Sequence, residues 1–102
     1  MNYDPKKHRE VKMLDVTESA KQELKRLLLV RTEEPDISLR LEGEPGQFRI
    51  KLDSEVPGDQ VLEYEGAKVL LVEPALALLL EEANLDVRDT PDGPKLVVLG
   101  IK

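Results

Sequence analysis

The chain has 102 residues, of which 40% are hydrophobic and 35% charged, and its formal net charge is −6. This length suits one domain, and the composition is that of an ordered, soluble globule rather than of a disordered chain. The acidic charge and the scarcity of aromatic residues argue against nucleic acid or an anionic membrane surface as a partner. Because the sequence contains no cysteine, disulfides, zinc–thiolate sites and cysteine-held iron–sulfur clusters are excluded within this chain.

Residues 1–12 show no hydrophobic periodicity, so we predict a flexible N-terminal tail there and a single domain over residues 13–102. Four basic side chains against two acidic ones give the tail a net charge of +2 and leave −8 on the rest of the chain. No apolar run reaches the length of a membrane span, and the N-terminus lacks the apolar region of a signal peptide. We therefore expect a cytoplasmic protein.

Met13, Leu14 and Val16 indicate a short strand or a lead-in to the first helix. Thr17 is expected to be the N-cap of that helix, which should run to about Val30. Apolar residues recur at helical spacing along it, at Ala20, Leu24, Leu27 and Leu28.

Ile37–Glu42 and Gln47–Asp53 are expected to be strands, because apolar and charged residues alternate in both. Leu39 and Leu41 should then face the core, while Arg40 and its charged neighbours should face solvent. Two further strands are expected at Gln60–Tyr64 and Ala67–Val72, joined at Glu65-Gly66 in a short hairpin.

A second helix should open at Glu73-Pro74, since proline is tolerated in the first turn, and should stop near Asn84. It is apolar on most sides and should be largely buried, with Leu76, Leu78, Leu79 and Leu80 as its apolar residues. The last two strands are expected at Leu85–Asp89 and at Lys95–Leu99, the latter covered on both faces. Hairpin-length connections favour antiparallel or mixed pairing, so we predict a strand-dominated α+β domain.

Gly43-Glu44-Pro45-Gly46, between the first two strands, is the candidate functional loop. Its two glycines permit positive φ, its proline fixes φ, and polar loops held by rigid strands often carry binding chemistry. Our candidate site residues are Gly43, Glu44 and Gly46.

The order of elements and turns resembles the HesB/IscA-type iron–sulfur cluster assembly domain, also called the A-type carrier family. The residues that carry the resemblance are Val16-Thr17, Leu39-Arg40-Leu41, Gly43-x-x-Gly46, Pro57-Gly58-Asp59 and Glu65-Gly66-Ala67-Lys68-Val69. The match covers about Met13 to Leu99. It implies a compact β-rich fold with two flanking helices, often found in dimers or tetramers.

The resemblance also implies where cluster ligands would stand. In that family an essential cysteine occupies the loop between the first two strands, at the position of Glu44 here, and a Cys-x-Cys pair lies near the C-terminus. This chain ends at Gly100-Ile101-Lys102 without that pair. It therefore resembles a divergent member that lacks all cysteines.

Carboxylates around the loops offer an alternative chemistry, because oxygen ligands suit Mg²⁺, Ca²⁺ or Mn²⁺. They are Glu42, Glu44, Asp53, Glu55 and Asp59. A solvated acidic rim is the simpler interpretation, and a plain hairpin explains Asp86, Asp89 and Asp92. The only histidine, His8, lies in the tail, and Ser19, Ser38 and Ser54 have no evident base nearby.

The sequence thus favours a non-catalytic HesB/IscA-like protein that acts as an accessory or interaction factor in iron–sulfur cluster assembly without ligating a cluster. The alternative is a divalent-cation-binding protein or an enzyme that uses carboxylates around Glu44. We expect no catalytic residue, no metal ligand and no cofactor. The expected partner is another protein or a second copy of the chain, in a homodimer.

Overall fold

The computed structural model describes residues 14–100, and the predicted tail, residues 1–12, lies outside the described residues. The helices are α2 (Glu18–Arg31) and α3 (Pro74–Leu79). The strands are β1 (Asp15–Val16), β2 (Ile37–Glu42), β3 (Arg49–Ser54), β4 (Gln60–Tyr64), β5 (Ala67–Val72), β6 (Asn84–Thr90) and β7 (Gly93–Leu99). The strand-dominated α+β class is therefore confirmed. None of the helices within residues 14–100 has the length and apolar character needed to cross a membrane.

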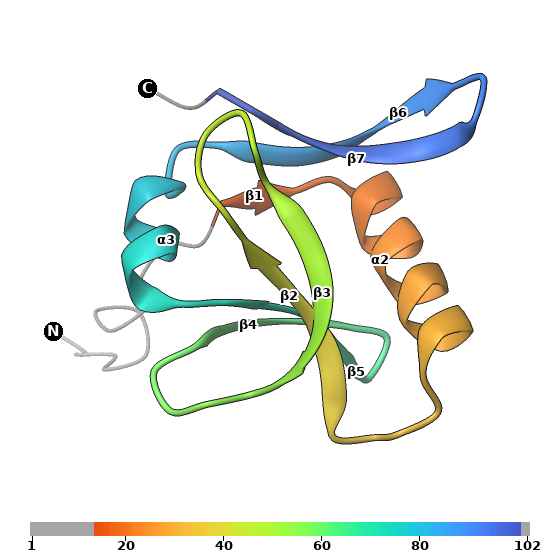
Figure 1. Ribbon diagram of the computed structural model, residues 1–102, viewed down its shortest axis with the longest axis vertical. Helices are drawn as coiled ribbons and strands as arrows, with labels where there is room; N and C mark the ends of the chain where they lie inside the picture. Colours follow the sequence, from red (N-terminus) through yellow and green to blue (C-terminus); the bar gives the residue numbers. More distant parts are fainter. Residues whose placement is uncertain (1–13, 101–102) are drawn as a thin grey trace, which may run out of the picture.

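The strands form two sheets, with α2 on one side of the molecule and α3 on the other (Figure 1). The four-stranded sheet has the order β3-β2-β5-β4, in which β2 and β5 run parallel and the outer pairs antiparallel. The three-stranded sheet has the order β1-β6-β7, with β1 parallel to β6 and the β6–β7 hairpin antiparallel. Mixed pairing, as the short connections predicted, is confirmed.

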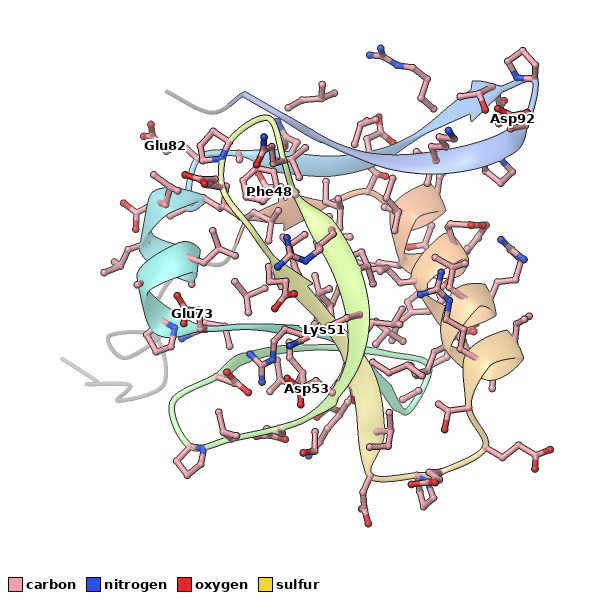
Figure 2. All side chains as sticks on the ribbon, in the orientation of Figure 1. Phe48, Lys51, Asp53, Glu73, Glu82 and Asp92 are labelled. Atoms are coloured by element: carbon pink, nitrogen blue, oxygen red, sulfur yellow. The ribbon has the colours of Figure 1, made fainter. Side chains whose placement is uncertain are left out.

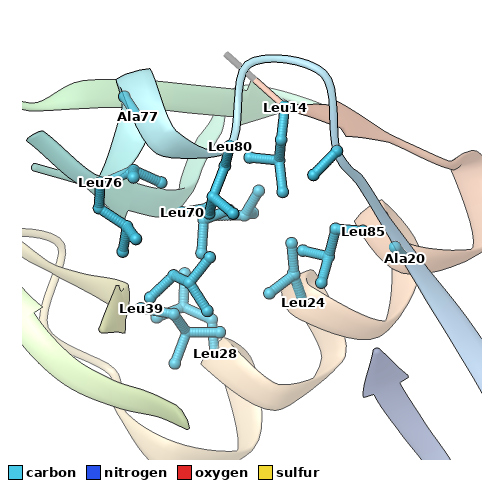
Figure 3. Close-up of a cluster of buried hydrophobic side chains, with 14 residues drawn as sticks. Leu14, Ala20, Leu24, Leu28, Leu39, Leu70, Leu76, Ala77, Leu80 and Leu85 are labelled. Carbon is cyan, nitrogen blue, oxygen red and sulfur yellow. The ribbon is translucent and has the colours of Figure 1, made fainter. Parts of the chain in front are cut away.

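Leucine, valine and alanine side chains from both sheets and both helices fill one core (Figure 3). Leu24, Leu39, Leu70, Leu80 and Leu85 are buried almost completely. Burying one such side chain contributes roughly 1.5–3 kcal/mol. With so few aromatic residues in the chain, this aliphatic packing supplies most of the hydrophobic stabilisation.

The predicted hairpin between β4 and β5 is confirmed, with Glu65 at φ 51° and Gly66 at φ 82° in its two-residue turn. Positive φ at both central residues is typical of a type I′ turn, whose twist matches that of paired strands. Tyr64 pairs with Ala67 directly across the turn.

The extent and burial predicted for the second helix were wrong. It ends at Leu79 rather than near Asn84, and Leu78 and Leu79 are 62% and 48% exposed. Leu80 begins a turn in which the amide of Ala83 donates to the carbonyl of Leu80 at 2.9 Å. This early turn brings Ala83 beside β1, whose Asp15 amide donates to the Ala83 carbonyl, and the helix is left with one buried face.

The prediction that the last strand is covered on both faces was also wrong. Leu96 and Val98 of β7 pack against the core, but Lys95 and Leu99 at its ends are exposed. Val97, on the face that Lys95 and Leu99 share, is only partly buried, so that face of β7 is not fully covered.

Helix α2 is joined to the β6–β7 hairpin through its N-cap. The predicted N-cap Thr17 accepts a hydrogen bond from the Ala20 amide at 3.1 Å and donates one to Asp86 Oδ1 at 2.8 Å. The same carboxylate accepts from the Val87 amide at 2.7 Å. These bonds hold down the pKa of Asp86, chiefly through the Val87 amide and then through Thr17.

We expect Thr17→Ala to lower the free energy of unfolding by about 1–2 kcal/mol, because it removes an N-cap and the bond to Asp86. Ser19→Ala, at an exposed position in the same turn, is the matched control and should change it by less than about 0.5 kcal/mol. Urea denaturation of the three proteins measures both effects. Equal stability of the two variants would contradict the role given to Thr17.

Candidate functional site

The three candidate residues, Gly43, Glu44 and Gly46, lie together in the exposed loop between β2 and β3. The Gln47 amide donates to the Glu44 carbonyl at 2.8 Å, which closes a four-residue turn. Pro45 takes its second position, and Gly46, at φ 88°, its third. Proline followed by a residue with positive φ is the pattern of a type II turn.

Gly43 is required for a different reason, which is the close approach of the backbone. Its φ is 107°, and a Cβ atom placed on it would lie 2.3 Å from the Gln47 carbonyl oxygen. No such distance is tolerated between non-bonded heavy atoms, so only glycine fits. By contrast, a Cβ atom on Gly46 would meet no heavy atom within 4 Å.

Glu44, the residue at the position that the family resemblance gives to a cysteine, is exposed. Its side chain forms no hydrogen bond or ion pair with a described residue. Phe48, at the end of the loop, is partly buried and packs against the core (Figure 2). The loop is thus anchored by Phe48 and shaped by two glycines, while Glu44 is turned to solvent.

Two ion pairs at the base of the loop neutralise the carboxylate of Glu42, the last residue of β2. Glu42 lies 2.8 Å from Arg49 Nε and 3.2 Å from Lys51 Nζ. Hydrogen bonds from Lys51 and then Arg49 lower the pKa of Glu42. All three side chains project from the face of the sheet that is turned away from the leucine core, since Leu41 pairs with Ile50 on the core face.

Arg40 does not face solvent as the alternation predicted. It is 8% exposed and lies under the segment that joins β3 to β4. Its guanidinium contacts both oxygens of Asp59, at 2.9 and 2.6 Å, and Asp53 Oδ2 at 2.8 Å. It also donates to the Ser54 carbonyl at 3.3 Å. The charged face that this residue shares with Lys51 and Asp53 is visible along β3 in Figure 2.

Asp59 completes this arrangement as the buried partner of Arg40. Its side chain has no exposed surface, and its Oδ2 also accepts the Val56 amide at 2.9 Å. The hydrogen bond that Arg40 donates is the main cause that lowers the pKa of Asp59. The same hydrogen bond is the main cause that raises the pKa of Arg40. The pKa of Asp53 is also lowered, first by the Ser54 amide and then by Arg40.

These contacts leave the divalent-cation hypothesis without structural support. Four of the five carboxylates proposed for it are already paired with basic side chains. Asp53 and Asp59 bind Arg40, and Glu42 is paired with an arginine and a lysine, as described above. Glu55 lies 2.9 Å from Lys68 Nζ. Within residues 14–100, no three histidine, aspartate or glutamate side chains are placed to hold a metal ion together.

The other sequence candidates also occupy ordinary structural positions. Asp89 and Asp92 belong to the β6–β7 hairpin, in which Asp89 pairs with Pro94, so the hairpin prediction is confirmed. Ser38 is buried on β2, whereas Ser19 and Ser54 are exposed. His8 lies outside the described residues.

The Arg40–Asp59 pair was missed by the sequence analysis, although one signal pointed to it. Val69–Val72 is an unbroken apolar run in β5, and such runs are typical of strands covered on both faces. Arg40 pairs with Leu71, which is fully buried, on the adjacent strand. A cover over Leu71 therefore has to extend over Arg40 as well.

We expect Gly43→Ala to lower the free energy of unfolding by about 3 kcal/mol, because strain at positive φ adds to the contact with the Gln47 carbonyl. Gly46→Ala should cost about 1 kcal/mol, from φ alone. Glu44→Ala should change stability by less than about 0.5 kcal/mol. Thermal melts of the three variants test this order, and a larger loss for Glu44→Ala than for Gly43→Ala would contradict it.

Replacing Asp59 with Asn should cost about 3 kcal/mol at pH 7, because Arg40 would stay buried without its main counter-charge. Glu55→Gln, in an exposed ion pair, should cost less than about 1 kcal/mol. Since the native pKa of Asp59 is lowered, its contribution is complete above about pH 4 and is lost as the pH falls further. Urea denaturation from pH 7 to pH 2 should show the difference between wild type and Asp59→Asn shrinking on acidification; a difference that stays constant would contradict the pairing.

No protein-family model matches the sequence, and no curated protein matches it at a significant level. The chain is similar to several solved structures, of which three are described. A protein from Aquifex aeolicus, studied by solution NMR, is 26% identical, with a TM-score of 0.63 over 86% of this chain and 91% of that one. Escherichia coli SufA, involved in biosynthesis of iron–sulfur clusters, is 20% identical, with a TM-score of 0.64 over 96% of this chain and 94% of SufA.

The third structure is IscA with a [2Fe-2S] cluster, 24% identical, with a TM-score of 0.56 over 84% of this chain and 83% of IscA. The likeness to SufA and IscA covers 96% and 84% of this chain, which confirms the fold expected from the sequence. The chain has a HesB/IscA-like fold, and it has that fold without a cysteine.

Proposed function

We propose that this chain is a non-catalytic accessory factor in iron–sulfur cluster assembly that does not itself ligate a cluster. One observation carries the proposal: a fold shared with SufA and IscA is kept in full while every thiol is absent. The role then depends on protein contacts, with an assembly protein or with a second copy of the chain. A cytoplasmic location remains a prediction.

The chemistry of the loop supports the non-ligating role. Iron–sulfur clusters are held mainly by cysteine thiolates, and Glu44 would offer only a hard carboxylate oxygen. The neighbouring Glu42 is already paired with Arg49 and Lys51. The loop residues Gly43, Glu44 and Gly46 remain our candidate site, as a shaped surface for a partner rather than as ligands.

The structure also supports a non-catalytic role. The carboxylates with lowered pKa values, such as Asp53, Asp59 and Asp86, accept hydrogen bonds that keep them ionised. A general base that works near neutral pH needs a pKa raised toward that range, and these shifts go the other way. Their geometry stabilises the fold instead.

Anaerobic incubation of the purified protein with iron and sulfide tests the proposal. We expect no visible absorption band and no iron that co-elutes with the protein after desalting, while IscA, whose structure contains a [2Fe-2S] cluster, is treated in parallel as the positive control. A stable, stoichiometric coloured cluster on this chain would overturn the non-ligating part of the proposal.

The accessory role needs a separate measurement. Affinity capture with the tagged protein, followed by mass spectrometry, should recover an identified iron–sulfur assembly protein. The recovery should be absent from a capture with an unrelated acidic protein of similar size. Capture that recovers no assembly protein would count against the role.

A further inference from the structure

A groove of about 650 Å³ lies at the end of the molecule opposite the β2–β3 loop. It is lined by the last turn of α2, the connection to β2, the first residues of β2, the end of β3 and the β4–β5 turn. Figure 1 shows these segments meeting at the lower right, where α2 ends and β2 begins. A volume of this size is typical of ligand-binding sites.

Apolar side chains form part of the groove's lining. They belong to Leu28, Leu29, Ile37 and Ala67. Leu29 is 66% exposed, and Val30 beside it is 73% exposed. Exposed aliphatic residues at the mouth of a groove favour a partner that brings apolar side chains of its own.

The rim of the same groove is acidic. Glu33, Glu34 and Asp36 stand on the connection between α2 and β2, and none forms an ion pair with a described residue. Lys68, which also lines the groove, is paired with Glu55 at 2.9 Å and lies near Asp36. Arg31 in the last turn of α2 offsets the negative potential of the helix end, so the acidic character of the rim comes from its carboxylates. A cationic partner would therefore be attracted to this rim.

A hydroxyl group is available inside the groove. Ser38 on β2 lines it and is only 4% exposed, and its side chain makes no hydrogen bond to a described residue. Its hydroxyl oxygen keeps some access to the groove, since no fully buried side-chain oxygen of residues 14–100 lacks a partner, and it can accept from an ammonium or an amide group. Because this residue is on β2 itself, the acceptor is held by the sheet rather than by a mobile loop.

We propose that the groove binds a basic segment of a partner protein, with apolar side chains against the apolar part of the lining, cationic side chains on the acidic rim and a donor on Ser38. This inference rests on the proposed function, because it names the kind of contact through which an accessory factor would act. A lone divalent cation would use the rim but leave the apolar part of the lining unsatisfied, and an anionic segment would be repelled by Glu33 and Glu34.

The probe for this proposal is a short fluorescein-labelled peptide in which lysine and leucine alternate, titrated against the full-length protein at low salt. Glu33→Gln with Glu34→Gln should weaken its binding roughly tenfold. The matched control, Glu73→Gln with Glu81→Gln, removes the same charge from exposed positions away from the groove and should change binding less than about twofold.

The apolar contribution is tested in the same way. Leu29→Ala should weaken peptide binding about fivefold, whereas Leu78→Ala, which truncates a comparably exposed leucine on α3, should not. A peptide with serine in place of leucine should bind more weakly, and raised salt should weaken both. NMR spectra of the labelled protein should shift at Ile37 and Ser38 on adding the lysine–leucine peptide.

If the groove variants and their matched controls lose equal peptide affinity, binding follows total charge alone and the proposal is overturned. NMR shifts confined to another face would overturn it as well, because the peptide would then bind elsewhere. The peptide measurement contains no iron or sulfide. If the peptide binds the groove but no assembly protein is captured, the proposed function is contradicted and the groove proposal stands. If an assembly protein is captured but the peptide does not bind the groove, the groove proposal is contradicted and the proposed function stands.

Discussion

The fold depends on a buried arginine. Arg40 lies in β2, an inner strand of the four-stranded sheet, and its guanidinium bridges Asp59 and Asp53. Burying a charge costs several kcal/mol unless it is paired and hydrogen-bonded. Here the pairing also fixes the β3–β4 connection over Leu71, because Asp59 stands at its end and accepts the Val56 amide within it. This face of the sheet is thus covered at Arg40 and Leu71, whereas Arg49 and Lys51 on the same face of β3 stay exposed.

Local patterns predicted most of the secondary structure because the elements follow local chemistry. The β4 and β5 strands, the short hairpin at Glu65-Gly66 and the Thr17 cap were predicted where the structure has them. Alternation failed at Arg40, since a two-residue period separates the faces of a strand but does not say which face is exposed. That information lies in pairing with Leu71, thirty-one positions away in the sequence.

The candidate loop was predictable in shape, whereas its chemistry and the groove were not. Two glycines and a proline fix the turn between β2 and β3, so Gly43 and Gly46 could be singled out from sequence. The groove is assembled from three separate stretches of chain, residues 28–38, 54–55 and 66–68, and depends on where α2 ends relative to β2. Likewise, Leu78 and Leu79 are exposed because the chain turns at Leu80 to reach β1, which no helical periodicity reveals.

Strand β2 connects these features. Ile37 and Ser38 line the groove, Arg40 holds the β3–β4 connection through Asp59, and Glu42 precedes the loop. The loop needs glycine for its backbone, whereas the Glu44 side chain has no partner among the described residues, so the packing of the fold does not depend on it. Arg40, by contrast, is bonded on both sides, to Asp53 on β3 and to Asp59 next to β4. The end of β2 can therefore change its side-chain chemistry without loss of packing, whereas its middle cannot.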